Sequence, residues 1–419
     1  MSDDKIKVLT ISDIPLGPSG VGIQTKNFIE GLLKTGKFKV VSLGGAIKHR
    51  DYKPIKTKEW GDDFIIYPVD GFGNEGTIRS ILRNERPDVM WIMTDPRFFE
   101  WLWSMENEIR SLVPLVYYHV WDNYPYPTFN KPWYISNDKI VTISKVTDDI
   151  VKNVAPEVDV EYLPHAVNNN VFKSFDRDLV KKLRIDNFGE NENKLVFFWN
   201  NRNAKRKMSS SLIYWFKSYL DKVGHDKAML IMHTDPKDVN GPDLEAIVAE
   251  LKLDDGQVMF SVSKLSDQDL AALYNIVDCT INISDAEGFG LSTLESLSCG
   301  TPIIVNMTGG LQEQVTDGTE WFGIPIYPVA KPIIGSQNVP FIYEDVINEK
   351  AFIDALEKMY LLSRKERRKI GEAGRNHALK NYNFLDFQKK WDDLMTKIYM
   401  ERGSWDDRKL YDRWSLKEV

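Results

Sequence analysis

The sequence predicts an α/β protein made of two doubly wound, Rossmann-like halves, each with a parallel sheet covered by helices. Three observations lead to this fold class. The chain has 419 residues, which is too long for one ordinary core and suits two domains. Short apolar, β-branched segments alternate with helical patterns, as they do in parallel sheets. The alternation stops in a polar stretch at residues 173–193 and then starts again.

The first half opens with a β-branched strand at residues 7–11, a glycine-rich turn at residues 17–22, and a helix carrying Phe28 and Leu32. Further strands are expected at residues 40–43, 64–67, 89–93, 115–119 and 139–143. Helical stretches separate these strands, so the first half should form one parallel sheet.

The second half begins with the apolar run at residues 195–199. Its other strands are expected at residues 229–232, 258–260, 279–283 and 302–305, and helices at residues 352–361, 364–380 and 385–400. We place the domains at residues 1–185, 186–383 and 384–419. The last is a helical segment that ends in a charged, aromatic stretch containing Trp405, Tyr411 and Trp414.

Composition narrows the function classes. A net charge of -7 argues against a general nucleic-acid binder, although Lys145, Lys152 and residues 48–58 leave room for a local basic patch. No apolar run reaches the ~20 residues of a membrane-spanning helix and no signal-peptide core is visible, so we expect a cytoplasmic protein. Cys279 and Cys299 stand in apolar contexts and are expected to be buried free thiols. The His and Cys residues show no metal-ligand spacing.

The most informative feature is a pair of glutamates, Glu287 and Glu295, with seven residues between them. A predicted strand, a loop bracketed by Gly288 and Gly290, and a helix starting at Leu291 carry the pair. A strand–loop–helix junction presents unpaired N–H groups and a positive helix dipole, which suit a phosphate. A pyrophosphate bound there would let Glu287 meet a sugar and Glu295 meet ribose hydroxyls. Each element of this pattern is common by itself.

The combination is more specific. The runs Glu-Gly-Phe-Gly-Leu, Leu-Glu-Ser-Leu-Ser-Cys-Gly-Thr-Pro-Ile-Ile-Val and Gly309-Gly310 resemble the donor-site signature of retaining nucleotide-sugar glycosyltransferases of family 4 (glycosyl transferases group 1). The resemblance implies the GT-B fold, with two Rossmann-like domains facing an interdomain cleft and the end of the chain crossing back to the first domain. It also implies transfer of a sugar from a nucleotide-diphosphate donor, with UDP-sugar as our expectation, to an acceptor hydroxyl. Donor-binding residues would then be Gly288, Phe289, Gly290, Leu291 and Glu295, while Glu287 would contact the sugar.

A second segment carries four positive charges in the six residues from Arg202 to Lys207. A solvated turn is the usual explanation, but the segment follows a predicted buried strand, where such sheets bind ligands. The family pairs an Arg and a Lys with four residues between them here, which Arg202 and Lys207 match. Asn201, where the family usually has Gly, and Met208 depart from its pattern. Two cations would neutralise the leaving diphosphate, so we expect neither a metal nor another cofactor.

The glycine-rich turn is a weaker signal, and an ordinary tight turn explains it equally well. It is not a Walker loop, because no Lys-Ser/Thr follows. The family places a loop here beside the donor phosphates and the acceptor, which implicates Gly20 and Gly22.

His119 ends the strand at residues 115–119. A lone histidine is more often structural, but the family places a His here, close to the donor sugar and the reacting centre. The aromatic residues after it, Trp121, Tyr124 and Tyr126, are either core or a stacking surface for an acceptor. His165 lies in a structural segment and could line the cleft.

The acceptor remains open among a glycan, a lipid, a small molecule and a modified DNA base. Three alternatives stand beside the transferase: the same chemistry on a hydroxylated base in viral DNA, a UDP-sugar epimerase of the same fold, and a non-catalytic sugar-nucleotide-binding scaffold. The basic segment and the Glu-Gly-Phe-Gly run favour a transferase. In the family, the acceptor is thought to attack from the face that the phosphate leaves, which needs no protein nucleophile.

Overall fold

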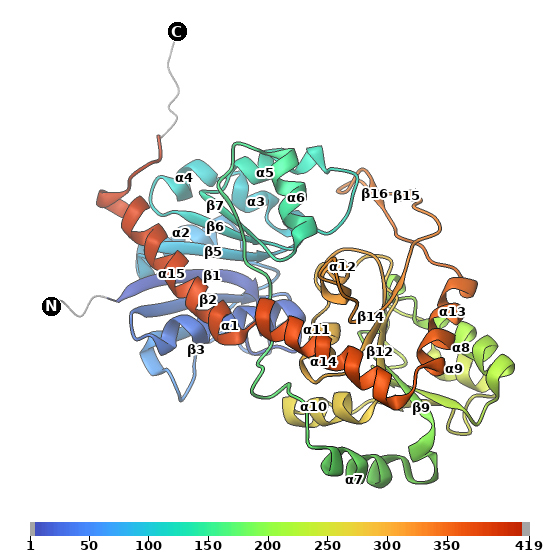
Figure 1. Cartoon of the computed structure of the whole chain (residues 1–419). Helices are drawn as coiled ribbons and strands as arrows, with labels where there is room; N and C mark the ends of the chain where they lie inside the picture. The colour runs from blue at the N-terminus through green and yellow to red at the C-terminus, as the bar shows by residue number, and fades with distance from the viewer. Residues whose placement is uncertain (1–4, 413–419) are drawn as a thin grey trace. The chain divides into compact units, whose positions relative to one another are not determined.

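The computed structural model describes residues 5–412, which fall into two compact units (Figure 1). Unit 1 contains the chain up to His165, the short segment Gln337–Pro340 and the chain from Leu385 onward. Unit 2 contains Ala166–Ser336 and Phe341–Phe384. Both units are α/β layers around a mostly parallel sheet, as the sequence predicts.

Unit 1 holds an eight-stranded sheet in the order β3-β4-β2-β1-β5-β6-β7-β8. All neighbouring strands are parallel except the edge strand β3, which is antiparallel to β4. The strands are β1 (Ile6–Asp13), β2 (Phe38–Gly45), β3 (Ile55–Lys56), β4 (Phe64–Pro68), β5 (Val89–Thr94), β6 (Leu115–His119), β7 (Lys139–Thr142) and β8 (Val160–Tyr162). The sequence analysis missed β3 and β8, which are short and partly exposed at the two edges.

The helices of unit 1 are α1 (Gly20–Lys34), α2 (Glu75–Glu85), α3 (Glu100–Trp103), α4 (Glu106–Arg110), α5 (Lys131–Ile135), α6 (Lys145–Val154) and α15 (Phe384–Arg402). Figure 1 shows α15, in red, lying along the sheet of unit 1. Its Trp391 is fully buried, with its ring centroid 4.9 Å from that of Phe28 and 6.0 Å from that of Trp91. The C-terminal helix therefore completes the core of unit 1.

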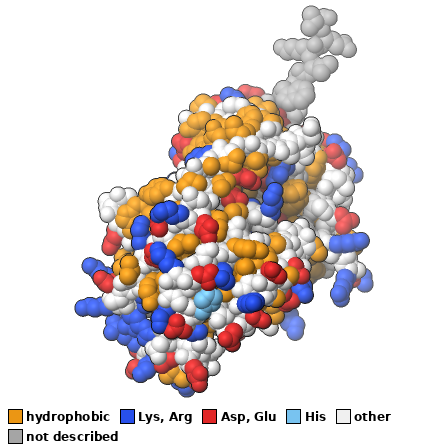
Figure 2. Space-filling view, turned by 90° about the vertical axis from the view of Figure 1, so that its right-hand side faces the viewer, with side chains coloured by type: hydrophobic (Ala, Val, Ile, Leu, Met, Phe, Trp, Pro, Cys, Tyr) orange, Lys and Arg blue, Asp and Glu red, His pale blue; other side chains and the backbone are white. Residues whose placement is uncertain are grey.

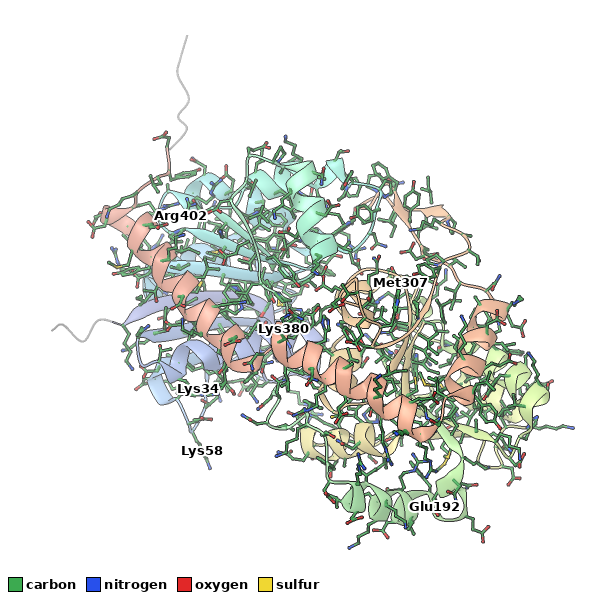
Figure 3. The ribbon with its side chains drawn as sticks, in the orientation of Figure 1. Lys34, Lys58, Glu192, Met307, Lys380 and Arg402 are labelled. Atoms are coloured by element: carbon green, nitrogen blue, oxygen red, sulfur yellow. The ribbon has the colours of Figure 1, made fainter. Side chains whose placement is uncertain are left out.

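The chain beyond α15 also stays on unit 1. Arg402, labelled in Figure 3, lies 3.5 Å from Asp138, and Arg408 donates to the same carboxylate at 2.7 Å. The backbone N–H of Trp405 donates to the carbonyl of Leu112. Trp414, named in the sequence analysis, lies outside the described residues.

Unit 2 holds a six-stranded sheet in the order β11-β10-β9-β12-β13-β14, with every pair parallel. The strands are β9 (Leu195–Asn200), β10 (Ala228–His233), β11 (Val258–Ser261), β12 (Cys279–Asn282), β13 (Ile303–Asn306) and β14 (Gly323–Ile326). The strand order reverses between β9 and β12, which makes this place the topological switch point where such sheets bind ligands. A short hairpin of β15 (Ile333–Ile334) and β16 (Ile342–Tyr343) follows β14.

Helices cover both faces of this sheet. They are α7 (Arg177–Phe188), α8 (Ser209–Val223), α9 (Leu244–Glu250), α10 (Asp267–Ile276), α11 (Leu291–Ser298), α12 (Leu311–Val315), α13 (Glu349–Leu361) and α14 (Arg364–Asn381). Short 3₁₀ turns in the two units are η1 (Gly61–Asp63), η2 (Pro96–Phe98), η3 (Thr128–Asn130), η4 (Gly189–Asn193), η5 (Lys205–Lys207) and η6 (Trp405–Asp407). Cys279 and Cys299 are buried free thiols.

The first unit boundary lies after His165, earlier than the predicted break after residue 185. The intervening segment is tied to unit 2 by hydrogen bonds. The N–H of Phe175 donates to Asn275 at 2.7 Å, and Arg184 on α7 donates to the carbonyl of Ile276 at 2.6 Å. The sequence misplaced the boundary because the polar composition of this segment resembles that of a linker.

Among residues 5–412, none of the helices combines the length and the hydropathy that crossing a membrane would require. On the face that Figure 2 shows, acidic and basic side chains are intermixed with apolar ones, consistent with the modest net charge of -7.

Candidate active site

The candidate site begins where the two central strands of unit 2 end. Phe198 on β9 pairs with Thr280 on β12, and two residues further along, the strands finish in Asn200 and Asn282. The loops that follow these two strands carry the basic segment and the first glutamate. Met307, labelled in Figure 3, follows β13 at the same edge of the sheet.

Glu287 lies in the loop after β12, with only 12 % of its side chain exposed. Its Oε2 forms a close ion pair with the ammonium of Lys207 and lies 3.8 Å from Arg206. Asn282 Nδ2 donates to the same oxygen at 3.2 Å, and Ser284 Oγ lies 3.4 Å from it. Burial raises the pKa of Glu287, but the charges of Lys207 and Arg206 outweigh it and hold the pKa at about 2. Glu287 is therefore a carboxylate at neutral pH.

The basic loop and the glutamate loop are also joined through their backbones. The N–H of Asp285 donates to the carbonyl of Arg206 at 2.9 Å, and Arg206 Nη1 donates to the carbonyl of Ala286 at 2.6 Å. Met208 ends η5 with a φ of 54°, a left-handed conformation that favours glycine. Met208, which departs from the family pattern, therefore adopts a backbone conformation that is strained for a residue other than glycine.

Arg202 has a different partner from the one its spacing to Lys207 suggests. Its Nε and Nη2 donate to the two carboxylate oxygens of Asp238 at 2.7 and 3.2 Å, and 65 % of its side chain is exposed. The hydrogen bond from Arg202 lowers the pKa of Asp238 well below its usual range. In this structure Arg206 is therefore the second cation beside Glu287. The sequence analysis missed Arg206 because a charge run does not show which of its members turns inward.

Glu295 lies on α11, and its side chain is held by an uncharged hydrogen-bond partner. The hydroxyl of Tyr274, on α10, donates to Glu295 Oε2 at 2.8 Å, and Asn200 Nδ2 donates to that hydroxyl at 2.9 Å. Burial raises the pKa of Glu295 to about 8. Because of their surroundings, the two glutamates differ in protonation near neutral pH: Glu287 is ionised and Glu295 is mostly neutral.

The glycine loop between them is closely packed and hydrogen-bonded. Gly290 has a φ of 93° and precedes α11, and a Cβ there would lie 2.5 Å from Leu311 Cδ2. Gln314 Nε2 donates to the carbonyls of Phe289 and Gly290 at 2.7 and 3.1 Å. Gly290 has no side chain to cap α11, so the helix presents an uncapped N-terminus at the loop that carries Gly288 and Leu291.

The glycine turn of unit 1 leads into α1. Gly20 is the first helical residue, and Ser19 caps the helix by accepting from the N–H of Gly22 at 3.0 Å. Ser19 Oγ also donates to Asp13 at 2.6 Å. A Cβ on Gly22 would lie 2.7 Å from the carbonyl oxygen of Ile14, so the turn itself requires this glycine.

His119 is the last residue of β6 and is completely buried in unit 1. Its Nε2 lies 2.8 Å from the hydroxyl of Tyr134, while Nδ1 has no hydrogen-bond partner among the described residues. Burial lowers the pKa of His119 to about 3, so the imidazole is neutral. His165 is also buried, with Nδ1 2.8 Å from the hydroxyl of Tyr118.

The aromatic residues after β6 divide into two kinds. Trp121 is buried and donates to the carbonyl of Asn123, as a core residue does. Tyr124 and Tyr126 both donate to Asp149 Oδ2, at 2.7 and 3.0 Å, and Tyr126 is exposed. Among residues 5–412, no group of three or more His, Cys, Asp and Glu side chains is arranged to hold a metal ion.

Residues 180–377 match the family described as glycosyl transferases group 1. The N-acetyl-alpha-D-glucosaminyl L-malate synthase of Bacillus anthracis is 27 % identical over 173 residues, which are 41 % of each chain. The MMP alpha-(1->4)-mannosyltransferase of Mycolicibacterium hassiacum is 40 % identical over 76 residues, 18 % of each chain. These alignments span less than half the length of either relative.

Solved structures match almost the whole chain. Sucrose-phosphate synthase of Thermosynechococcus elongatus aligns with a TM-score of 0.73 at 16 % identity, over 94 % of this chain and 100 % of that one. Anabaena Alr3699/HepE in complex with UDP-glucose aligns with a TM-score of 0.68 at 14 % identity, over the same shares. The fold is therefore GT-B. The family match covers residues 180–377, which are less than half of the chain, so the chain resembles the glycosyl transferases group 1 family over this region.

Proposed function

We propose that the protein transfers a sugar from a nucleoside diphosphate sugar, of the UDP class, to an acceptor hydroxyl with retention of anomeric configuration. The observation that carries the proposal is geometric: Glu287, held by Lys207 and Arg206, and Glu295, linked through Tyr274 to Asn200, are both tied to the carboxyl edge of the unit 2 sheet. The choice of UDP is supported by the likeness to a fold neighbour in complex with UDP-glucose.

The donor would lie across the carboxyl edge of the unit 2 sheet. Its diphosphate would face Lys207, Arg206 and the uncapped N-terminus of α11, with Arg202 available from its exposed position. Glu295 would bind the ribose hydroxyls, and Glu287 would bind the sugar hydroxyls. The backbone from Gly288 to Leu291 would line the diphosphate and the sugar.

The charge developing on the diphosphate as it leaves would be stabilised by the cations of the basic loop, which is why we propose that no metal is required. Glu287 is engaged by a buried ammonium group and is a poor nucleophile in that state. A retaining reaction without a protein nucleophile fits this arrangement. The acceptor would attack from the face that the phosphate leaves, and the departing phosphate would take the acceptor's proton.

In unit 1, the family pattern assigns Gly20 and Gly22 to the donor phosphates and His119 to the donor sugar. We retain these roles as proposals. With its pKa lowered to about 3, His119 would contribute a hydrogen bond and not a proton at neutral pH. The exposed Tyr126 is a candidate for contact with the acceptor.

A thermal-shift titration with UDP, GDP, ADP and their sugars, with and without a chelator, tests the donor site. We expect UDP compounds to raise the melting temperature equally in both conditions. No shift with any nucleotide would overturn the site assignment, and a shift lost in chelator would overturn the metal-free part. With a donor that binds, NMR of the product should show the anomeric configuration of the donor, whereas isomerised sugar without acceptor would indicate an epimerase.

A further inference from the structure

The two central strands of unit 2 end in the same residue type. Asn200 is the last residue of β9 and Asn282 the last of β12, two positions beyond the paired residues Phe198 and Thr280. Each asparagine is connected to a different glutamate of the candidate site, and neither was singled out by the sequence analysis.

Asn282 is completely buried and its amide orientation is fixed by its partners. Its Oδ1 accepts from the backbone N–H of Ser284 at 3.1 Å and from Ser284 Oγ at 2.6 Å. A backbone N–H needs an acceptor, so the oxygen must face Ser284 and the Nδ2 must face Glu287 Oε2, 3.2 Å away. Asn282 therefore holds the Glu287 carboxylate from the side of the sheet, next to the ion pair with Lys207.

Asn200 reaches Glu295 through one intermediate. Its Nδ2 donates to the hydroxyl of Tyr274, which is fully buried. An amide nitrogen can only donate, so the single hydroxyl proton of Tyr274 is left for Glu295 Oε2 at 2.8 Å. The hydrogen bonds therefore run in one direction: Asn200 donates to Tyr274, and Tyr274 donates to Glu295.

From these contacts we infer that Asn282 and the Asn200–Tyr274 pair are positioning residues that hold the two glutamates independently, Asn282 for sugar transfer and Asn200–Tyr274 for nucleotide binding. The inference rests on the proposed function, because it takes Glu287 to contact the sugar and Glu295 the ribose. In the described residues, no hydrogen bond joins one set to the other, which makes the two effects separable.

The test uses three nearly isosteric changes. Asn282→Asp keeps the acceptor for Ser284 and replaces the donor facing Glu287 by a repelling oxygen. Asn200→Asp makes an acceptor compete with Glu295 for the proton of Tyr274, and Tyr274→Phe removes that proton without adding charge. Ser296→Ala serves as the control, because Ser296 is a buried polar residue of α11 whose Oγ donates to Thr280 and makes no hydrogen bond to either glutamate.

We expect Asn282→Asp to lower kcat about tenfold or more while the Kd for UDP stays within about threefold. We expect Asn200→Asp and Tyr274→Phe to raise the Kd for UDP about tenfold, with kcat at saturating donor within about threefold. Ser296→Ala should change neither constant by more than about twofold. Parallel changes of both constants in all three site variants would overturn the inference.

A second readout separates this inference from the proposed function, because it needs no substrate. Carboxyl carbon NMR of Glu-labelled protein, assigned with Glu287→Gln and Glu295→Gln, follows both titrations. Asn282→Asp should raise the pKa of Glu287 only, against the opposing charges of Lys207 and Arg206. Tyr274→Phe should raise that of Glu295 only, whose neighbours include Asp267. If either variant shifted the pKa values of both glutamates, independent positioning would be overturned, even in a protein that binds UDP. A wild-type protein that binds no nucleotide would overturn only the proposed function.

Discussion

The ammonium group of Lys207 and the carboxylate of Glu287 form a largely buried ion pair that joins the loop after β9 to the loop after β12. The side chains are 8 % and 12 % exposed, so water screens the pair little. Removing one member of such a pair leaves an uncompensated buried charge, whereas removing both does not.

This relationship predicts an asymmetric effect on stability. Lys207→Met should lower the free energy of unfolding by about 3 kcal/mol or more, and adding Glu287→Gln should restore most of the loss. Urea denaturation of the two variants measures the difference. If the Lys207→Met protein were as stable as the wild type, the prediction would be wrong, because Glu287 would not be left as an uncompensated buried charge.

The same lysine should matter for the reaction. Lys207→Ala should reduce sugar transfer by roughly 10²-fold, because a charge facing the departing diphosphate is lost. Lys205→Ala is the matched control, since Lys205 carries the same charge in the same 3₁₀ turn but is exposed. It should retain activity within about twofold. Equal losses in steady-state assays of the two variants would mean that only the net charge of the loop matters.

Arg202 must exchange a carboxylate for a phosphate if it binds the donor, because Asp238 occupies its guanidinium. Arg202→Ala should therefore weaken UDP binding about tenfold, whereas Asp238→Asn, which removes the competing charge, should strengthen it about threefold. Isothermal titration calorimetry gives both values. Weakening by both substitutions would identify the pair as structural.

Glu295 should make both stability and nucleotide binding depend on pH. Its folded pKa of about 8 lies above its ordinary value of 4.5, so its contribution to stability is full below pH 4.5 and is lost as pH rises through 8. Glu295→Gln should abolish this loss, which amounts to about 1.4 kcal/mol for each pKa unit of the shift. Thermal denaturation between pH 5 and 9 compares the two proteins.

For binding, the sign is opposite. A carboxylate accepts ribose hydroxyl hydrogen bonds better than a neutral carboxyl group, so UDP affinity should rise between pH 7 and 9 with release of a proton. Calorimetry in two buffers of different ionisation enthalpy counts that proton. The Glu295→Gln protein should bind UDP more weakly and without the pH dependence. A wild-type affinity that falls over this range would contradict the ribose assignment.

Two glycines of unit 2 allow backbone strain to be separated from steric contact. Gly290 and Gly318 have φ values of 93° and 94°, but a Cβ would touch Leu311 at the first position and meet nothing within 4 Å at the second. Gly318→Ala should cost about 1–2 kcal/mol of stability and leave activity unchanged. Gly290→Ala should lower the stability by a larger amount and also reduce sugar transfer, because the added methyl group would collide with Leu311 and displace the glycine loop. If the two variants had equal effects in denaturation and activity assays, the packing of Gly290 against Leu311 would have no role of its own in transfer.

The sheets were predictable because their central strands are buried on both faces and read as continuous apolar runs. β3 and β8 were missed because they are short edge strands, and β14 because Gly323 and Pro325 interrupt its pattern. The boundary near residue 165 was missed because Arg184 and Phe175 make their tertiary contacts through hydrogen bonds that composition does not show.

In the candidate site, the sequence indicated Glu287, Glu295 and Lys207 through spacing and charge. It could not show that Arg206 turns toward Glu287 while Arg202 turns toward Asp238, because a run of charges does not reveal the partner of each member. Tyr274 escaped notice for a related reason. An aromatic residue on a helical face looks like core, and only its hydroxyl contact with Glu295 distinguishes it.

The placement of Trp391 against Phe28 and Trp91 has a consequence for biosynthesis. A ribosome that has made residues 1–384 has produced every strand of both sheets but not the body of the helix that covers these two side chains. Unit 2 can therefore finish folding while unit 1 still exposes aromatic surface, and the half that is begun first is completed last. This interval is when the nascent chain is most exposed to aggregation and to chaperones.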